Sequence, residues 1–281
     1  MKYGHITIKM QTLTNLLPQV MALAAQAGQA IMTVYADPAN AVVAKADHSP
    51  LTQADLAADR IISAGLARLT PGWPQLSEES AQTAYADRRA WQRFWLIDPL
   101  DGTKEFIKRN GEFTVNIALI ENGIPVLGVV HAPALDVSYY AARGMGANVQ
   151  RGGVAAHPIR VQSHTVGQPI KVVASRSHSD ARTSALLERL GAYECISMGS
   201  SLKLCLVAEG AAHFYPRLGP TMEWDTAAAH VIVKEAGGVV CDLEGNELQY
   251  NKADLHNPEF LVMPAQDKAL RVSSVKNEKQ Y

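Results

Sequence analysis

Residues 94–106 read Phe-Trp-Leu-Ile-Asp-Pro-Leu-Asp-Gly-Thr-Lys-Glu-Phe, and this stretch decides how the rest of the chain is interpreted. Its first four residues are bulky and apolar, which is typical of a buried strand that delivers Asp98 to its end. Pro99 cannot donate a hydrogen bond to a neighbouring strand, so it predicts a turn there. Asp101 returns three residues after Asp98, and Gly102 allows the backbone to approach a ligand closely.

Two carboxylates in one tight turn repel each other unless a cation lies between them. Hard divalent cations such as Mg²⁺ prefer oxygen ligands of this kind, completed by water and phosphate oxygens. Residues 103–107 are expected to begin a short helix, whose free N–H groups would face the same turn and suit a phosphate. The pattern alone leaves open a plain turn capped by Asp98, because Asp-Gly and Pro turns are common.

Other ligand-binding loops are excluded by their spacing. An EF-hand needs oxygen ligands at alternating positions and glycine at the sixth, whereas Leu100 is third and Gly102 fifth here. The chain has no GxxxxGK[ST] loop of the Walker type. The Gly-Met-Gly at residues 144–146 lacks the third glycine of a dinucleotide-binding loop, which favours a hairpin turn.

Length and composition set the outer limits. The 281 residues suffice for one large domain or two closely packed ones, and 47% hydrophobic with 19% charged residues indicates a globular chain. With 26 Lys+Arg and 27 Asp+Glu the net charge is −1, which argues against a nonspecific nucleic-acid binder. The three cysteines have no CxxC spacing, so neither a zinc site nor a disulfide framework is expected, and a reducing compartment is the default.

The N-terminal region allows two interpretations. Lys2 and Lys9 precede a mostly apolar run with small-residue patterns near residues 22–27, as in a secretory signal. Pro18 interrupts that run, and large and small apolar residues recur at helical spacing, which favours an amphipathic first helix. These residues are Leu16, Val20, Leu23, Ala27, Ala30 and Ile31. No long apolar segment elsewhere predicts a membrane span.

Periodicity and turn residues predict an α/β chain in two units that meet near residue 160. In the first unit, residues 1–160, a helix at 13–35 and a second that begins near Thr52 and stops before Pro71 precede strands at 94–97, 114–120, 126–131, 138–141 and 147–149, an α+β arrangement. In the second unit, residues 161–281, strands at 171–174, 213–215, 239–241 and 259–263 alternate with helices at 180–190, 200–209 and 225–236. This alternation is typical of a layered α/β unit.

Three further acidic sites stand out, each with an ordinary alternative. The adjacent Glu78 and Glu79 would point to opposite sides of an extended chain, so only one could reach a shared metal, and such pairs are usually solvated surface. Asp225 precedes Thr-Ala-Ala and reads equally as a helix cap. Asp55, three residues after Thr52, reads as part of a helix start.

Taken together, the motifs resemble the lithium-sensitive, magnesium-dependent phosphatase superfamily that includes the inositol monophosphatases. Its pattern of a Glu-Glu pair, then Asp-Pro-Leu/Ile-Asp-Gly-Thr, then Trp-Asp with small residues occurs here in order at residues 78–79, 98–103 and 224–227. The resemblance covers about residues 16–265. It is strongest to the CysQ-type 3′(2′),5′-bisphosphate nucleotidases, through residues 45–55 (Lys-Ala-Asp-His-Ser-Pro-Leu-Thr-Gln-Ala-Asp), 95–130 and 199–203 (Gly-Ser-Ser-Leu-Lys). Inositol monophosphatases usually have Thr-Asn-Phe where this chain has Lys-Glu-Phe at 104–106.

The resemblance implies an αβαβα sandwich and a role for each matching residue. Two or three Mg²⁺ ions would be held by Glu78, Asp98, the Leu100 carbonyl, Asp101 and Asp225, with Glu79 behind them. Asp55 and Thr103 would orient and deprotonate the attacking water. The substrate would meet Glu78, Asp101, Gly102, Thr103, Lys104, His178, Ser200, Lys203, Arg217 and Asp225. The first unit would then carry most metal ligands, and the second would carry Asp225 and substrate contacts.

The implied reaction is hydrolysis of adenosine 3′,5′-bisphosphate to AMP and phosphate, with inhibition by Li⁺. An inositol monophosphatase and a catalytically silent phosphate-binding regulator are the alternatives. The complete acidic set argues against the silent regulator. A small nucleotide bisphosphate is the expected partner, without nucleic acid and without a membrane span. The expected location is the cytoplasm, with peripheral association on the cytoplasmic side of the inner membrane left open, as is the oligomeric state.

Overall fold

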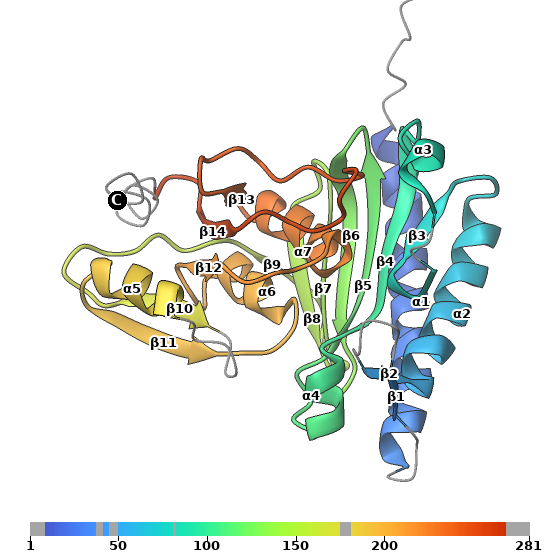
Figure 1. The fold of residues 1–281 in the computed structure, drawn as a ribbon, viewed down its shortest axis with the longest axis horizontal. Helices are drawn as coiled ribbons and strands as arrows, with labels where there is room; N and C mark the ends of the chain where they lie inside the picture. Colours follow the sequence, from blue (N-terminus) through green and yellow to red (C-terminus); the bar gives the residue numbers. More distant parts are fainter. Residues whose placement is uncertain (1–8, 38–41, 45–49, 81–82, 175–180, 268–281) are drawn as a thin grey trace, which may run out of the picture.

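A seven-stranded sheet separates two N-terminal helices from the rest of the fold (Figure 1). The computed structural model describes residues 9–37, 42–44, 50–80, 83–174 and 181–267. The strand order of the large sheet is β3-β4-β5-β6-β7-β8-β9. β3 pairs parallel with β4 and all other neighbours are antiparallel. Its strands are β3 Gln75–Ser77, β4 Arg93–Asp101, β5 Thr114–Glu121, β6 Ile124–Ala132, β7 Val137–Ala142, β8 Ala147–Arg151 and β9 His157–Ile159.

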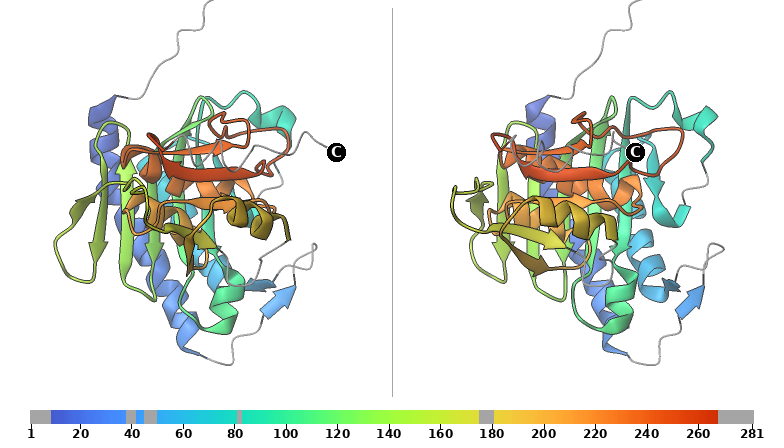
Figure 2. Two further views of the ribbon diagram at one scale, coloured as in Figure 1. Left: turned by 90° about the vertical axis from the view of Figure 1, so that its left-hand side faces the viewer. Right: turned by 60° about the vertical axis from the view of Figure 1, so that its left-hand side comes forward.

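Helices α1 (Met10–Ala36) and α2 (Gln53–Leu69) cover one face of this sheet (Figures 1 and 2). Both helices confirm the expected segments, because the apolar residues recur on one side and are buried there. A Cβ added at Gly65 would lie 2.2 Å from the Leu23 side chain, so the glycine lets the two helices approach closely. A short hairpin of β1 (Val42–Ala44) and β2 (Pro50–Thr52) lies between them in sequence. No helix in the described ranges is both long and apolar enough to cross a bilayer.

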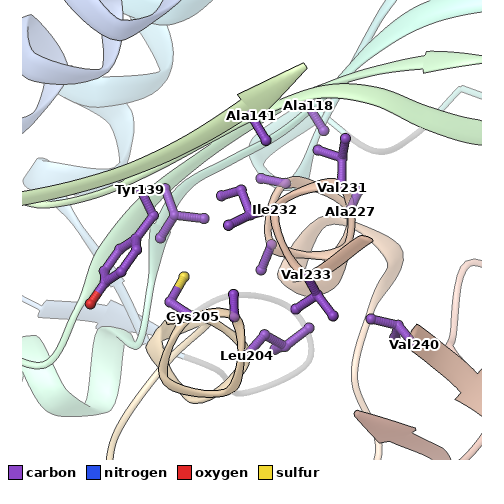
Figure 3. Close-up of a cluster of buried hydrophobic side chains, with 14 of the residues drawn as sticks. Ala118, Tyr139, Ala141, Leu204, Cys205, Ala227, Val231, Ile232, Val233 and Val240 are labelled. Carbon is purple, nitrogen blue, oxygen red and sulfur yellow. The ribbon is translucent and has the colours of Figure 1, made fainter. Parts of the chain in front are cut away.

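Helix α7 (Glu223–Glu235) lies against the opposite face, together with α6 (Leu202–Ala208). Figure 3 shows Val231 and Ile232 of α7 pointing toward the sheet, while Val233 faces the strands beyond. The approach is close: a Cβ on Gly128 of β6 would lie 2.3 Å from the Ala228 carbonyl oxygen. The position of α7 over the sheet therefore depends on glycine in β6.

Two smaller sheets and α5 (Ala181–Arg189) complete the outer layers. β10 (Ile170–Ala174) pairs parallel with β11 (Tyr193–Ser197), and the order β12-β14-β13 is antiparallel. These strands are β12 Tyr215–Arg217, β13 Gly238–Asp242 and β14 Phe260–Pro264. Apolar residues of α5 pack on them, giving the layers helix, sheet, helix, sheet, helix (Figure 1). The expected layered α/β sandwich is confirmed, whereas the division into two units near residue 160 stays a prediction.

Several local expectations are corrected by the structure. Pro99 lies inside β4, which continues to Asp101 across a register shift, because the unpaired residues are accommodated as a bulge. Glu78 and Glu79 lie in a 3-10 turn (Glu78–Ser80) rather than an extended segment. The strand expected at 213–215 is shifted to β12, and β11 was not expected because its residues are mostly exposed and lack an apolar pattern. The short α3 (Tyr85–Arg88) and α4 (Thr103–Lys108) complete the helices of the described residues.

Candidate active site

The bulge at the end of β4 carries two of the predicted acidic residues. The Asp98 side chain is 1% exposed, and its Oδ1 accepts the Leu100 N–H at 3.1 Å. This bond is available because the register shift removes Leu100 from the pairing with β5. The Leu100 carbonyl accepts the Thr103 hydroxyl at 3.4 Å. The strand therefore ends in a side-chain-supported turn, and α4 begins directly after it, as expected.

Gly102 closes this turn in the left-handed conformation, with φ of 90°. A side chain there would be strained and would press on the Glu112 carbonyl oxygen, 3.2 Å from an added Cβ. Lys104, in the first turn of α4, is exposed. The glycine thus brings the α4 backbone close to the second acidic residue, Asp101.

Asp101 is held by hydrogen bonds from residues that are distant in the sequence. Its Oδ2 accepts the Ser201 N–H at 2.5 Å and the Asn116 amide at 3.5 Å. Ser200 adopts a positive φ of 47°, which turns the following N–H toward Asp101. The Ser201 hydroxyl in turn bonds Thr114 and Asn116, at 2.9 and 2.8 Å. This hydroxyl cluster joins the start of α6 to the beginning of β5.

Asp225 lies in the first turn of α7, and its Oδ2 accepts the Met222 N–H at 3.0 Å. The helix begins at Glu223, two residues before the expected start, so Asp225 is a third-position partner in a capping interaction and not the cap itself. Burial, followed by the charge of Asp101, raises its pKa from 3.8 to about 8. Burial also raises the pKa of Asp101 to about 6, although the Lys203 charge opposes this.

Four other predicted acidic residues all affect the pKa of Asp98. Burial raises the pKa of its carboxyl well above 3.8, and the charges of Glu78, Asp101, Asp225 and Asp55 raise it further. Glu78 directly follows β3. Because β3 and β4 are parallel and Ser77 is paired with Ile97, Glu78 and Asp98 come next at the same end of two neighbouring strands. We refer to the side chains of Asp55, Glu78, Asp98, Asp101 and Asp225 as the acidic cluster.

The side chains of the acidic cluster lie near one another, but their oxygens do not point at a common centre. Among the described residues, no group of three or more Asp, Glu, His or Cys side chains is already placed to hold a metal ion. Asp98, Asp101 and Asp225 each use one carboxylate oxygen on a backbone N–H. Within the described part of the chain, no donor is bonded to the other oxygen of any of the three. Mutual repulsion keeps such oxygens apart, and a cation would draw them together.

A cavity of about 140 Å³ opens beside the cluster. Its lining residues are Asp101, Gly102, Lys104, Glu105, Gly199, Ser200, Ser201, Lys203, Leu204, Tyr215, Arg217, Thr221, Asp225, Thr226 and Phe260. Lys203 is buried and donates to the Ser200 carbonyl at 2.6 Å, and burial lowers its pKa. Arg217 donates to the Pro220 carbonyl at 2.8 Å, while its buried Nε lacks a hydrogen-bond partner among the described residues. The cavity thus combines acidic groups with two cations.

Most of the predicted site residues meet at this cavity, with some exceptions. Five predicted residues do not line it: Asp55, Glu78, Asp98, Leu100 and Thr103. Asp55 is buried in the first turn of α2. His178 lies outside the described residues, as does the 45–49 part of the predicted motif. Sequence reasoning missed Tyr215 and Asn116 as neighbours of the site. Asn116 had a possible signal, being a polar residue in an otherwise apolar strand, whereas nothing around Tyr215 marked it.

Comparison with known proteins gives a consistent result. The family model "Inositol monophosphatase family" matches residues 12–280. The proteins named 3′(2′),5′-bisphosphate nucleotidase CysQ in Escherichia coli K12 and in Salmonella typhimurium are 52% and 53% identical over 250 residues, covering 88% of this chain and 99% of each relative.

Solved structures agree. The crystal structure of CysQ from Bacteroides thetaiotaomicron, titled a bacterial member of the inositol monophosphatase family, is 43% identical with a TM-score of 0.80, covering 90% of this chain and 98% of that one. The IMPase of Thermotoga maritima is 28% identical with a TM-score of 0.75, covering 92% and 96%. The layered fold, the acidic cluster at the bulge of β4 and these matches lead to one conclusion: this chain belongs to the inositol monophosphatase family.

Proposed function

We propose that this chain is a Mg²⁺-dependent 3′(2′),5′-bisphosphate nucleotidase that hydrolyses adenosine 3′,5′-bisphosphate to AMP and phosphate. The observation that carries the proposal is the acidic cluster beside a cavity that also holds the cations of Lys203 and Arg217. A site for a small polyanion held through metal ions needs both features. The relatives named CysQ, about half identical over nearly their full length, support the nucleotide as substrate.

The donor set fits Mg²⁺, because it consists of carboxylate and carbonyl oxygens. Two or three ions would be held by Glu78, Asp98, the Leu100 carbonyl, Asp101 and Asp225. The raised pKa values of Asp98, Asp101 and Asp225 support this fit, because burial and then neighbouring carboxylates raise them, and a divalent charge would oppose both effects. When bound, Mg²⁺ would lower the pKa of a coordinated water and neutralise the charge on the phosphate oxygens.

Asp55 and Thr103 would orient the attacking water and accept its proton. The Asp55 carboxylate is 1% exposed and within electrostatic reach of Asp98, and the Thr103 hydroxyl points at the Leu100 carbonyl. Water attacks phosphorus in line, the bond from phosphorus to the sugar oxygen breaks, and that oxygen is protonated as AMP leaves. A covalent phosphoenzyme is not needed.

The phosphate that stays on the product would be neutralised by Lys203 and Arg217, which face the cavity from α6 and β12. The buried ammonium of Lys203 is near Asp101, so it would connect the retained phosphate to the reacting end. The other substrate contacts would come from Glu78, Asp101, Gly102, Thr103, Lys104, His178, Ser200 and Asp225.

The deciding experiment compares three substrates in one assay. Mg²⁺-dependent phosphate release is measured for adenosine 3′,5′-bisphosphate, inositol 1-phosphate and fructose 1,6-bisphosphate, with Asp98→Asn as the matched inactive control. We expect the highest kcat/KM for the nucleotide. A higher value for inositol 1-phosphate would instead identify an inositol monophosphatase. No release from any of the three would leave a silent phosphate-binding regulator.

We place this activity in the reducing cytoplasm, which is consistent with Cys195 and Cys205 being free thiols. The amphipathic side of α1 is buried against the sheet, so the helix is part of the folded core. N-terminal sequencing of the natural protein tests the location. A mature N-terminus near Ala25 or Gly28 would overturn it.

A further inference from the structure

The Glu223 side chain is fully buried at the first residue of α7, two positions before Asp225. Among the described residues, the donors to its carboxylate all come from one loop. Oε2 accepts the Asn251 N–H at 2.6 Å, and Oε1 accepts the Lys252 N–H at 3.0 Å and the Lys252 ammonium at 2.6 Å. A buried carboxylate with this many donors is unusual at a helix start, where solvent normally provides them. Glu223 therefore ties the start of α7 to residues 251–252.

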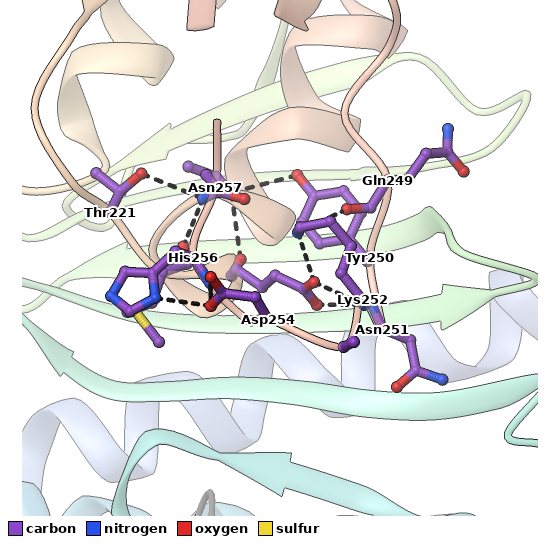
Figure 4. Close-up of polar contacts among 12 residues, drawn as sticks. Thr221, Gln249, Tyr250, Asn251, Lys252, Asp254, His256 and Asn257 are labelled. Atoms are coloured by element: carbon purple, nitrogen blue, oxygen red, sulfur yellow. Dashed lines mark hydrogen bonds and ion pairs between the residues drawn. The ribbon is translucent and has the colours of Figure 1, made fainter. Parts of the chain in front are cut away.

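The loop of residues 251–257 wraps around the same helical turn. The Glu223 N–H donates to the Leu255 carbonyl at 2.9 Å. The Asn257 amide donates to the Met222 carbonyl at 2.7 Å, and its backbone N–H donates to the Thr221 carbonyl at 2.8 Å. Figure 4 shows Asn257 at the centre of these contacts, with Lys252 and Asn251 beside them. The backbone of Met222 and Glu223 is therefore hydrogen-bonded to this loop on either side of the peptide bond that joins them.

The loop is itself held by Arg88 of α3, which is 2% exposed. Its guanidinium donates to the Asn251 side chain at 2.9 Å and to the carbonyls of Lys252 and Ala253 at 2.6 and 3.0 Å. Asn251 returns a bond from its amide to the Arg88 carbonyl at 2.8 Å. The loop around Glu223 is therefore anchored to the large sheet side of the fold and not left to move with α7.

We propose that Glu223 is a positioning residue for the metal site: by fastening the first turn of α7 to the Asn251–Lys252 backbone, it sets the direction of the Asp225 carboxylate. The link is short. Asp225 Oδ2 is bonded to the Met222 N–H, and Met222 directly precedes Glu223, so movement of this turn moves the remaining oxygen, Oδ1. This inference rests on the proposed function, because it needs Asp225 to bind Mg²⁺.

The test variant is Glu223→Gln, which keeps the size of the side chain. Its amide nitrogen cannot accept a hydrogen bond, so one donor among Asn251 and Lys252 loses its partner inside the fold. Outer-shell partners of metal ligands typically affect metal affinity 10- to 100-fold, so we expect the dissociation constant for Mg²⁺ to rise about tenfold. Saturating Mg²⁺ should restore kcat to within about threefold of the wild-type value, because Asp225 itself is still present.

The primary readout is Mg²⁺ binding, measured by calorimetry with the metal alone on the full chain. The matched control is Glu247→Gln. Glu247 also contacts α7, through His230 and Lys234, but at the far end from Asp225. A lowered Tm is expected in both variants, whereas weaker Mg²⁺ binding is expected only in Glu223→Gln. A role in stability alone would not produce that difference.

A folded Glu223→Gln protein with wild-type Mg²⁺ affinity would overturn the inference. Should this variant fail to fold, Lys252→Met decides instead. It removes the ammonium but keeps the backbone N–H, and the Lys252 side chain is 30% exposed, so folding is expected. It should weaken Mg²⁺ binding about threefold, in line with the smaller change, and unchanged affinity would again overturn the inference. Absence of Mg²⁺ binding by the wild-type protein would refute the proposed function instead.

Discussion

Removing the charge of Asp225 should stabilise the protein when Mg²⁺ is absent, although it damages the proposed metal site. The perturbation is Asp225→Asn, which retains an oxygen to accept the Met222 N–H. The wild-type carboxyl has a pKa of about 8 in the folded protein, because of burial and of the charge of Asp101, and an ordinary value of 3.8 without these effects. The folded protein therefore holds the proton in a pH range where the unfolded chain has released it.

The sign follows from proton linkage. Below about pH 4 the raised pKa of Asp225 leaves the free energy of unfolding unchanged. As the pH rises it lowers that free energy increasingly, and the loss is complete near pH 8. Each pH unit in this range is about 1.4 kcal/mol, so from about pH 5 to about pH 7 the cost grows by up to about 3 kcal/mol. Solvent partly reaches Asp225, and halving for this screening leaves about 1.5 kcal/mol. At about 2–4 °C per kcal/mol, this corresponds to a Tm difference of about 3–6 °C.

The assay is thermal unfolding of wild type and Asp225→Asn in EDTA at about pH 5 and pH 7, repeated with Mg²⁺. We expect the wild type to lose more Tm than the variant between the two pH values, and to regain it with Mg²⁺. Asp87→Asn, an exposed change on α3, is the matched control and should follow the wild type. Parallel pH curves for wild type and Asp225→Asn in EDTA would refute the electrostatic reasoning.

Three further predictions concern the reaction, the substrate and the scaffold. Asp98→Asn should lower phosphate release from adenosine 3′,5′-bisphosphate by about two orders of magnitude or more with an unchanged circular dichroism spectrum, and near wild-type turnover would contradict the site. Lys203→Met should lower kcat/KM about tenfold for the bisphosphate but little for adenosine 3′-monophosphate, because a charge-assisted contact to the second phosphate is lost; equal losses on both substrates would argue against that contact. Gly128→Ala should destabilise the fold by about 1–3 kcal/mol in denaturant unfolding, since its Cβ would meet the Ala228 carbonyl at 2.3 Å. Gly153→Ala, with open space around it, is its control, and a similar loss in both would contradict the packing argument.

The elements that sequence reasoning predicted correctly are those specified by local patterns. Apolar spacing in α1 and α2 predicts amphipathic helices, and both are found with that side buried. The turn at Asn122 and Gly123 joins β5 to β6 with positive φ at both residues, the conformation that Asn-Gly favours in a two-residue hairpin. The boundaries of α7 and β12 were less accurate, because helix and strand ends depend on which backbone groups find partners in the fold.

The candidate site likewise contains residues whose proximity local sequence predicts and residues that only tertiary packing brings together. Asp98 and Asp101 come from one short stretch, so their proximity could be predicted from a proline, a glycine and a strand. Ser201 and Asp225 follow a hundred or more residues after Asp101, and nothing local indicates that they meet it. They do so because α7 packs directly on β4 and β5, and α6 packs against α7. The residues that hold these partners, such as Glu223 and Asn257, carried no local signal of that role.

By itself, the sequence indicated the chemistry of this protein: two carboxylates at the end of a buried strand, a short helix after them, and a family pattern spread over the chain. The tertiary structure decided how these carboxylates stand toward one another and toward Lys203. It buried Asp98, raised the pKa values of Asp101 and Asp225, and engaged one oxygen of each carboxylate with a backbone N–H. The physical reason is that residue type and spacing are local properties, whereas burial and charge repulsion depend on which distant segments the packed core brings together.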